Sequence, residues 1–177
     1  SPETMVYHKS RTLFALNVAK KSKSKRYILC EGYMDVISMH EAGFDTAVCA
    51  CGTALTAEQA KLLSEYADEV GLSYDSDEAG QKATERSLGI MANTPMKVSV
   101  LSYQGAKDPD EFIKKYGRER FEMLLNGTAN PTEFQLKKAK SKYDLRSDDG
   151  RLSYIREAID ILTERGVSPT ARDVYGG

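Results

Sequence analysis

The segment that decides the fold reads Tyr27-Ile28-Leu29-Cys30-Glu31-Gly32: an apolar run ends at a carboxylate, and a glycine follows directly. A short apolar run of this kind is typical of a buried β-strand. The strand would deliver Glu31 to its carboxyl end. Gly32 is then expected to make a turn that a side chain would obstruct. The sequence therefore predicts a strand with a functional acid at its tip.

A second segment repeats this plan further along the chain. The apolar run 69–74 is followed by Asp75-Ser76-Asp77-Glu78-Ala79-Gly80, in which acids precede a helix-forming stretch. Parallel strands end at the same edge of a sheet, and open α/β sheets bind their ligands at that edge. We therefore expect Glu31, Asp75 and Asp77 to converge there, with Gly80 in a supporting role.

The rest of the chain up to residue 101 alternates between strand-like and helix-like segments. Strands are predicted at 27–30, 46–50, 69–74 and 96–101. Helices are predicted at 34–42, at 57–66 with Thr56 as the cap, and at 78–91. This alternation predicts right-handed parallel crossovers. The expected fold class is α/β, with a mainly parallel four-stranded sheet flanked by helices. A strand order of 2-1-3-4 would put its switch point between Glu31 and Asp75.

Three regions are expected. An entry segment with a helix over 11–20 occupies 1–26, the sheet domain occupies 27–128, and a small all-helical subdomain occupies 129–177. In the sheet domain, short helices are predicted at 112–116 and 118–125, on either side of Gly117. In the subdomain, Pro131 is suited to the first turn of a helix, and apolar residues recur at helical spacing after Gly150.

The composition is ordinary for a soluble globular protein. Of 177 residues, 41% are hydrophobic and 29% charged, and the net charge is −1. This balance gives no overall attraction for nucleic acid, so a polyanion would need a local basic patch or a bridging metal. Cys30, Cys49 and Cys51 lie in apolar contexts, as expected for buried thiols in a reducing cytosol rather than for a zinc site. No apolar run is long enough for a membrane helix.

The acids form the strongest candidate for chemistry. Asp35, Asp108 and Asp110 add to the carboxylates expected at the sheet edge. Clustered carboxylates repel one another unless a cation is present. Magnesium prefers such oxygen ligands, and two ions could stabilise both oxygens of a phosphoryl transfer. The alternative is that the acids before the helix at 78–91 simply cap it.

Phosphate-binding candidates are weaker. Lys9 and Arg11 lie upstream and could neutralise phosphates or be ordinary surface residues. Backbone N–H groups of Gly52 and Thr53 could also meet a phosphate, but the loop lacks the lysine of a P-loop.

The motifs around these acids resemble the Toprim domain of bacterial DnaG-type primases. The segments concerned are Glu31-Gly32-Tyr33-Met34-Asp35-Val36, Asp75-Ser76-Asp77-Glu78-Ala79-Gly80 and Asp108-Pro109-Asp110. The upstream segments Ser1-Pro2-Glu3-Thr4 and His8-Lys9-Ser10-Arg11 are also similar. The resemblance covers residues 1–117 well, whereas the later helices match in kind only.

The resemblance implies a Toprim fold and a metal-dependent nucleotidyltransferase: a DNA primase that makes short RNA primers on single-stranded DNA. Its expected partners are the template strand, ribonucleoside triphosphates and the RNA primer, with Mg²⁺ as cofactor and Mn²⁺ as a substitute. The implied catalytic residue is Glu31. The implied metal ligands are Glu31, Asp75, Asp77, Asp108 and Asp110. Lys9 matches a basic residue of the polymerase groove.

Some expectations concern what lies outside this chain. Zinc is expected only in a preceding amino-terminal domain, and the replicative helicase is expected to bind a carboxyl-terminal domain that is absent here. A cytoplasmic location at the bacterial replisome is implied, and the fragment alone is expected to be weakly active or inactive. One departure is Ser76, where the family usually has glycine. The alternatives are another Toprim enzyme, such as a topoisomerase or nuclease, and a non-catalytic Toprim binding module.

Overall fold

The computed structural model describes residues 11–50, 54–127 and 131–164. The chain divides into two compact units, Ser1–Thr128 and Ala129–Gly177. The first unit contains the sheet, and the elements described in the second are helices.

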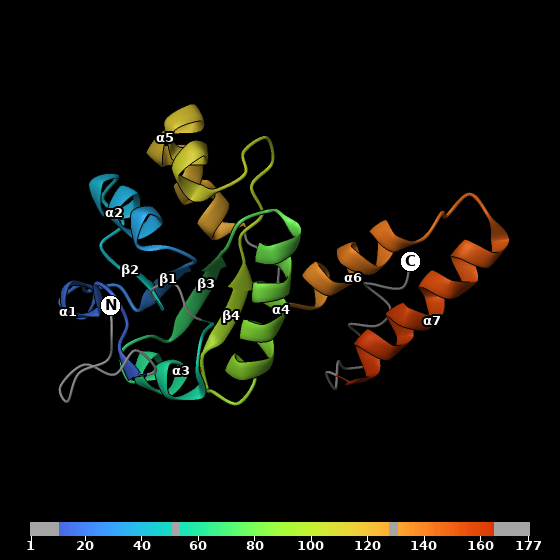
Figure 1. Cartoon of the computed structure of the whole chain (residues 1–177), viewed down its shortest axis with the longest axis horizontal. Coiled ribbons are helices and arrows are strands. Elements are labelled where there is room, and N and C mark those ends of the chain that lie inside the picture. The colour runs from blue at the N-terminus through green and yellow to red at the C-terminus, as the bar shows by residue number, and fades with distance from the viewer. Residues whose placement is uncertain (1–10, 51–53, 128–130, 165–177) are drawn as a thin grey trace. The chain divides into compact units, whose positions relative to one another are not determined.

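The first unit is built on one four-stranded sheet (Figure 1). Its strands are β1 (Arg26–Cys30), β2 (Ala47–Cys49), β3 (Glu69–Ser73) and β4 (Lys97–Val100). They are ordered β2-β1-β3-β4, and every neighbouring pair is parallel. The expected sheet and strand order are therefore confirmed. The apolar residues of β1 and β3 are buried, as is usual where helices cover both faces of a parallel sheet.

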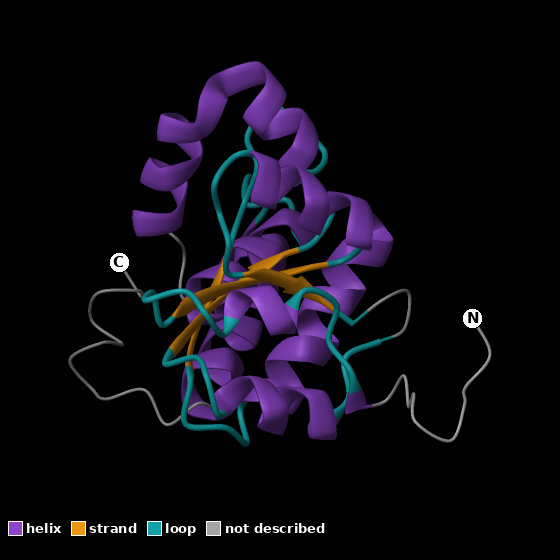
Figure 2. Ribbon diagram, turned by 90° about the vertical axis from the view of Figure 1, so that its left-hand side faces the viewer, coloured by secondary structure: helices purple, strands orange, loops and turns teal. Residues whose placement is uncertain are grey.

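Helices cover both faces of this sheet (Figure 2). The helices of the first unit are α1 (Leu16–Ala19), α2 (Tyr33–Glu41), α3 (Ala57–Ser64), α4 (Glu78–Met91) and α5 (Pro109–Asn126). Buried residues of α2 and α5 join Ile28 and Cys30 of β1 in one apolar cluster. Because side chains alternate along a strand, Tyr27 and Leu29 point to the opposite face, where α3 and α4 contact each other.

Local sequence signals fix the ends of the helices. Thr56 caps α3 in a reciprocal pair with Gln59: the Gln59 amide donates to Thr56 Oγ1 at 3.1 Å, and the Thr56 amide donates to Gln59 Oε1 at 3.0 Å. After α2, Gly43 has φ +90°, a conformation that glycine adopts without strain. Gly117 has φ 81° and ψ 169° and bends α5 into two helical segments, as predicted.

The first helix is much shorter than expected, with four residues in place of a run over 11–20. The reason is tertiary. The Phe14 amide donates to the Cys49 carbonyl of β2 at 2.9 Å, so this part of the chain pairs with the sheet. Ala15 follows with φ 63°. The helix can begin only after that turn.

The second unit contains α6 (Pro131–Lys142) and α7 (Asp148–Glu164). The two helices pack against each other, and Glu157 of α7 accepts hydrogen bonds from Lys142 and from the Tyr143 hydroxyl. Leu152, Ile155 and Ile159 of α7 are about half exposed, at 54%, 49% and 56%. Across the described parts of both units, no helix has the length and apolar character needed to cross a membrane.

Candidate functional site

The switch point of the sheet lies between β1 and β3, where Cys30 pairs with Ser73. Glu31 comes one residue after β1, and Asp75 comes two residues after β3. The Asp75 amide lies 3.4 Å from Glu31 Oε2 and donates to it. The two acids therefore meet at one carboxyl edge, as the topology predicted.

The turn that carries Asp75 closes against the start of α4. Asp77 is the N-cap of this helix and accepts the Gly80 amide on Oδ1 at 2.8 Å. A Cβ at Gly80 would lie 2.1 Å from the Asp75 carbonyl oxygen, so only glycine fits there. Among described non-glycine residues only Ala15 has positive φ, so the turn at Ser76 needs no glycine.

Asp108 repeats this arrangement at the start of α5. It is the N-cap and accepts the Glu111 amide on Oδ1 at 2.7 Å. The capping interpretation is therefore right for Asp77, and Asp108 is a cap that the sequence analysis did not predict. Capping does not exclude cation binding, because a carboxylate has a second oxygen.

The hydrogen bonds of Ser76 join these two acidic turns. Its amide and its hydroxyl both donate to the Lys107 carbonyl, at 3.0 and 3.2 Å. The segment after β4 is thereby held against the segment after β3. The sequence analysis missed this link because it depends on a backbone carbonyl, which carries no residue-type signal.

Asp35 lies in the first turn of α2, shortly after Glu31 in the chain. Its Oδ2 accepts the Gly32 amide at 3.1 Å. Gly32 itself is extended, at φ −117°, a conformation that any residue can adopt. The backbone conformation therefore does not explain why a side chain would obstruct this turn. A Cβ there would instead lie 3.3 Å from Asp35 Oδ2. Burial raises the pKa of Asp35, and the neighbouring carboxylates raise it further.

Among the carboxylates at this edge, Asp75 has the most strongly shifted pKa. Burial, followed by the charges of Glu31, Asp35, Asp108 and Asp77, raises the pKa of Asp75 to about 6. All four neighbours carry charge of the same sign. A bound cation would lower this electrostatic cost.

Asp110 is held differently. It accepts hydrogen bonds from Ser38 Oγ at 2.5 Å and from Lys114 Nζ at 2.6 Å. Both hydrogen bonds lower the pKa of Asp110, and the bond from Lys114 has the larger effect. Its carboxylate therefore already has a cation beside it. Ser38 was missed by the sequence analysis, although it lies three residues after Asp35 on the same helix.

The chemistry of these side chains suits a hard divalent cation. The donors at the edge are carboxylate oxygens, which Mg²⁺ and Mn²⁺ prefer. In the side-chain positions seen here, no three His, Cys, Asp or Glu residues of the described ranges are close enough to form a ligand set. Cys30 and Cys49 are buried, in line with their expected role as small core residues.

The remaining predicted residues are placed only in part. Lys9, Gly52, Thr53 and Cys51 lie outside the described residues. Arg11 is exposed at the beginning of the described chain, and the structure places no contact between it and the acids. Of the expected phosphate-binding residues, only Arg11 can therefore be compared with the edge.

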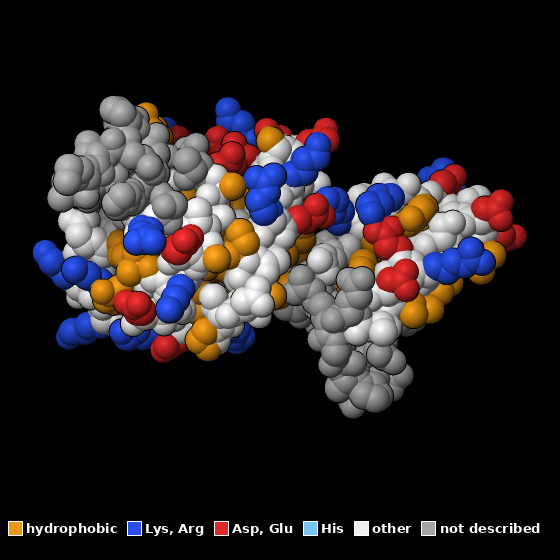
Figure 3. All heavy atoms as spheres, turned by 60° about the horizontal axis from the view of Figure 1, so that its bottom comes forward, with side chains coloured by type: hydrophobic (Ala, Val, Ile, Leu, Met, Phe, Trp, Pro, Cys, Tyr) orange, Lys and Arg blue, Asp and Glu red, His pale blue; other side chains and the backbone are white. Residues whose placement is uncertain are grey.

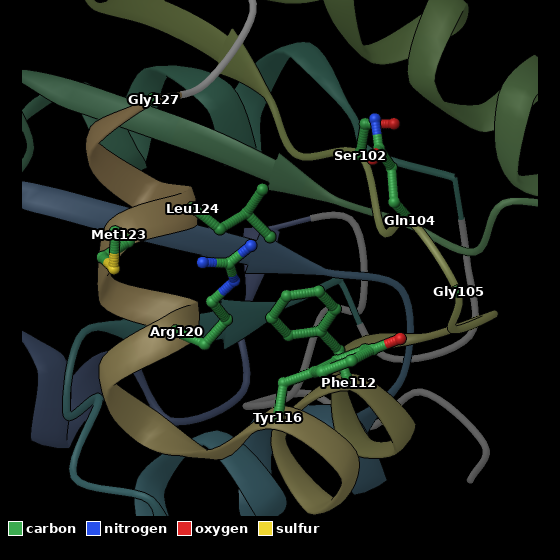
Figure 4. A pocket seen from close by; sticks show the side chains of 9 residues that line it. All are labelled: Ser102, Gln104, Gly105, Phe112, Tyr116, Arg120, Met123, Leu124 and Gly127. Atoms are coloured by element: carbon green, nitrogen blue, oxygen red, sulfur yellow. The ribbon is translucent and has the colours of Figure 1, made fainter.

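Two of the hollows on the first unit bear on the position of the site. One of about 260 Å³ opens beside Glu31 and is also lined by Tyr74, Arg86 and Ser87. A larger one of about 700 Å³ lies between the segment after β4 and α5 (Figure 4). Arg120 and Tyr116 project into it from α5, and its lining contains no carboxylate. The larger hollow is therefore separate from the acidic edge.

Family models match both units. Residues 28–113 match a family described as Toprim-like, and residues 132–175 match the DnaB-helicase binding domain of primase. The second match corrects one expectation: the segment related to helicase binding lies within this chain, in its helical part. The sequence analysis missed it because these helices carry no distinctive motif.

Similar proteins are DNA primases. The chain is 37% identical over 176 residues to that of Clostridium acetobutylicum, covering 99% of this chain and 29% of that protein. It is 33% identical over 163 residues to that of Aquifex aeolicus, covering 90% of this chain and 33% of that protein. The chain thus spans about a third or less of these curated relatives.

Solved primase structures share the fold. The RNA polymerase domain of Mycobacterium tuberculosis DnaG with double-stranded DNA has a TM-score of 0.78 at 31% identity, covering 99% of this chain and 57% of that one. A DnaG catalytic domain bound to single-stranded DNA has a TM-score of 0.75 at 28% identity, covering 98% and 57%. The similarity to primases therefore holds for both the sequence and the fold of this chain.

Proposed function

The chain corresponds to the Toprim-containing segment of DnaG-type DNA primases, and we propose that it carries the catalytic centre of such an enzyme. In this proposal the complete protein is a DNA-directed RNA polymerase. It makes short RNA primers on single-stranded DNA during replication by metal-dependent nucleotidyl transfer. The chain's net charge of −1 fits this role if the template is held largely by other parts of the protein.

The observation that carries the proposal is the meeting of Glu31 and Asp75 at the switch point, with Asp77 and Asp108 in the adjoining turns. Phosphoryl transfer requires positive charge beside the attacking and leaving oxygens. Carboxylates cannot supply that charge themselves, but they can hold metal ions that do. The raised pKa of Asp75 supports this assignment, because repulsion among the acids favours a cation.

The proposed cofactor is Mg²⁺, with Mn²⁺ as a substitute. Asp75, Asp77 and Asp108 would each offer a carboxylate oxygen, while Glu31 would hold or orient the ion nearest the reacting phosphate. When bound, the ion would stabilise negative charge on the phosphate oxygens. Asp110 belongs to the proposed set less directly, because Ser38 and Lys114 already bind its carboxylate.

The proposed partners follow from the family. The template is single-stranded DNA, the substrates are ribonucleoside triphosphates, and the product is an RNA primer. The replicative helicase is a further proposed partner, through the helical segment 132–175. Zinc is expected only in another domain of the complete protein. The proposed location is the cytoplasmic replication complex of a bacterium.

Substitution of Glu31 in the complete primase tests the catalytic role. Glu31→Gln preserves the shape of the side chain but removes a charge that orients the metal. We expect primer synthesis to fall about 10²-fold or more, equivalent to roughly 2.7 kcal/mol of barrier. The thermal midpoint should hold or rise, because one of several like charges is removed.

A double substitution tests the metal site separately. Asp75→Asn with Asp77→Asn should abolish Mn²⁺ binding measured by calorimetry, and primer synthesis with it. Asp149→Asn is the matched control, since this acid lies on α7 in the other unit. Normal polymerisation by Glu31→Gln, or unchanged Mn²⁺ binding by the double variant, would falsify the proposal.

A further inference from the structure

Lys107 is fixed beside the acidic edge by its backbone. Its carbonyl accepts two hydrogen bonds from Ser76, the residue between Asp75 and Asp77. Its amide donates to Glu111 Oε2 at 3.0 Å, and Asp108 follows it as the N-cap of α5. The backbone of Lys107 is thus held next to both acidic turns.

The side chain of Lys107 is exposed. Within the described residues, its ammonium group has no carboxylate at ion-pair distance. Other lysines near the edge are engaged: Lys114 pairs with Asp110 and Lys82 with Glu78, both at 2.6 Å. Among the described residues, Lys107 is therefore a lysine beside the edge whose charge no carboxylate neutralises.

We propose that Lys107 binds phosphate oxygens of the incoming ribonucleoside triphosphate. This inference rests on the proposed function. Metal ions held by the acids would contact one side of the phosphate chain and leave negatively charged oxygens on its outer side. A lysine on the adjoining turn can neutralise them, because its ammonium group acts as a flexible point charge for phosphate. The backbone clamp positions that charge while its long stem lets the ammonium move.

A different role would also place a lysine here. Lys107 could serve only as a counter-charge that reduces repulsion among the carboxylates. The two roles differ in what the lysine contacts during turnover. A phosphate-binding lysine affects the KM for nucleotide, whereas a counter-charge competes with metal and affects metal affinity instead.

Steady-state kinetics of the complete primase test the proposal. With saturating template, Lys107→Ala should raise the KM for ribonucleoside triphosphate about 10-fold, as expected for the loss of one charge-assisted hydrogen bond. The kcat should stay within about 2-fold, because the metal site remains. Lys107→Arg should restore most of the affinity, since it keeps the charge. The matched control is Lys97→Ala: Lys97 begins β4 at the opposite edge of the sheet, where it pairs with Glu69, and this variant should leave KM unchanged.

Calorimetry with Mn²⁺ alone supplies the second measurement. Lys107→Ala should bind Mn²⁺ as the unsubstituted primase does. An unchanged KM in Lys107→Ala, or a KM rise matched by Lys97→Ala, would overturn the inference, as would tighter Mn²⁺ binding without a KM effect. Failure of the proposed function is distinguishable, because then primer synthesis would survive the loss of Asp75 and Asp77.

Discussion

Two carboxylates at this site cap helices with one oxygen and leave the other available for the proposed metal. Asp77 and Asp108 each use one oxygen to cap a helix, which fixes the direction of the side chain without consuming the whole group. Capping and metal binding were competing interpretations of the sequence. The geometry makes them compatible, because a cap orients a donor in advance of the ion.

Asp75 makes the stability of the first unit depend on pH. Its pKa is raised from 3.8 to about 6 in the folded state, so the folded protein retains a proton that the unfolded chain releases. This contribution to the free energy of unfolding is present below about pH 4 and is lost as the pH rises through about 6. In the presence of EDTA, the thermal midpoint should therefore include a contribution from Asp75 that falls as the pH rises between these two values. Asp75→Asn should remove that contribution.

Divalent metal should act in the opposite direction. In the proposed site Mg²⁺ binds the ionised carboxylates of the folded state, so it should raise the midpoint at pH 7.5 far more than at pH 4.5. An NMR titration of Asp75 provides a direct measurement. Titration near its ordinary pKa without metal would contradict the electrostatic description of the site.

At the scale of elements, the sequence predicted most of the sheet unit because its signals are local. Strands were short apolar runs, and Thr56 and Gly117 marked helix boundaries that the structure confirms. The shortening of α1 was not predictable, since it depends on a bond from Phe14 to a distant strand. Likewise, nothing in the sequence indicated that Ser38 and Asp110, far apart in the chain, would pair.

The start of α4 offers a prediction with an internal control. Gly80→Ala would place a Cβ 2.1 Å from the Asp75 carbonyl oxygen, so the turn must move. We expect lower stability and weaker Mn²⁺ binding. Gly89→Ala, in the same helix, meets no atom within 4 Å. It should stabilise the protein by roughly 0.5–1 kcal/mol, because alanine favours the helix.

Urea unfolding and Mn²⁺ calorimetry on both variants provide the measurements. If Gly80→Ala kept both the stability and the metal affinity of the unsubstituted protein, the close packing of this turn would have no bearing on the site. Equal effects of the two substitutions would assign the change to helix propensity alone.

At the scale of the molecule, the chain joins a sheet unit with one acidic edge to a helical unit with a half-exposed apolar stripe on α7. The sequence predicted two such regions from the change in pattern after the fourth strand. It could not indicate the role of the second, because amphipathic helices look alike whatever they bind. The match of 132–175 to a helicase-binding family came only from comparison with relatives.

The distribution of charge leads to the last prediction. The chain has 25 basic and 26 acidic residues, and on the face in Figure 3 the two signs are interspersed rather than separated. Affinity for single strands comes largely from basic grooves that follow the phosphates. We therefore expect the 177-residue chain alone to synthesise little or no primer, although it should still bind Mn²⁺ through Asp75 and Asp77.

The measurement compares this chain with the complete primase on the same single-stranded template, at equal concentration and low salt. Calorimetric Mn²⁺ binding shows that the isolated chain is folded at the site, so a lack of primer would then reflect poor template binding. Raising the template concentration should recover part of the activity, because weak binding is overcome by mass action. Primer synthesis equal to that of the complete enzyme at ordinary template concentration would mean that this chain contains the template groove, and that its near-neutral charge conceals a local basic surface.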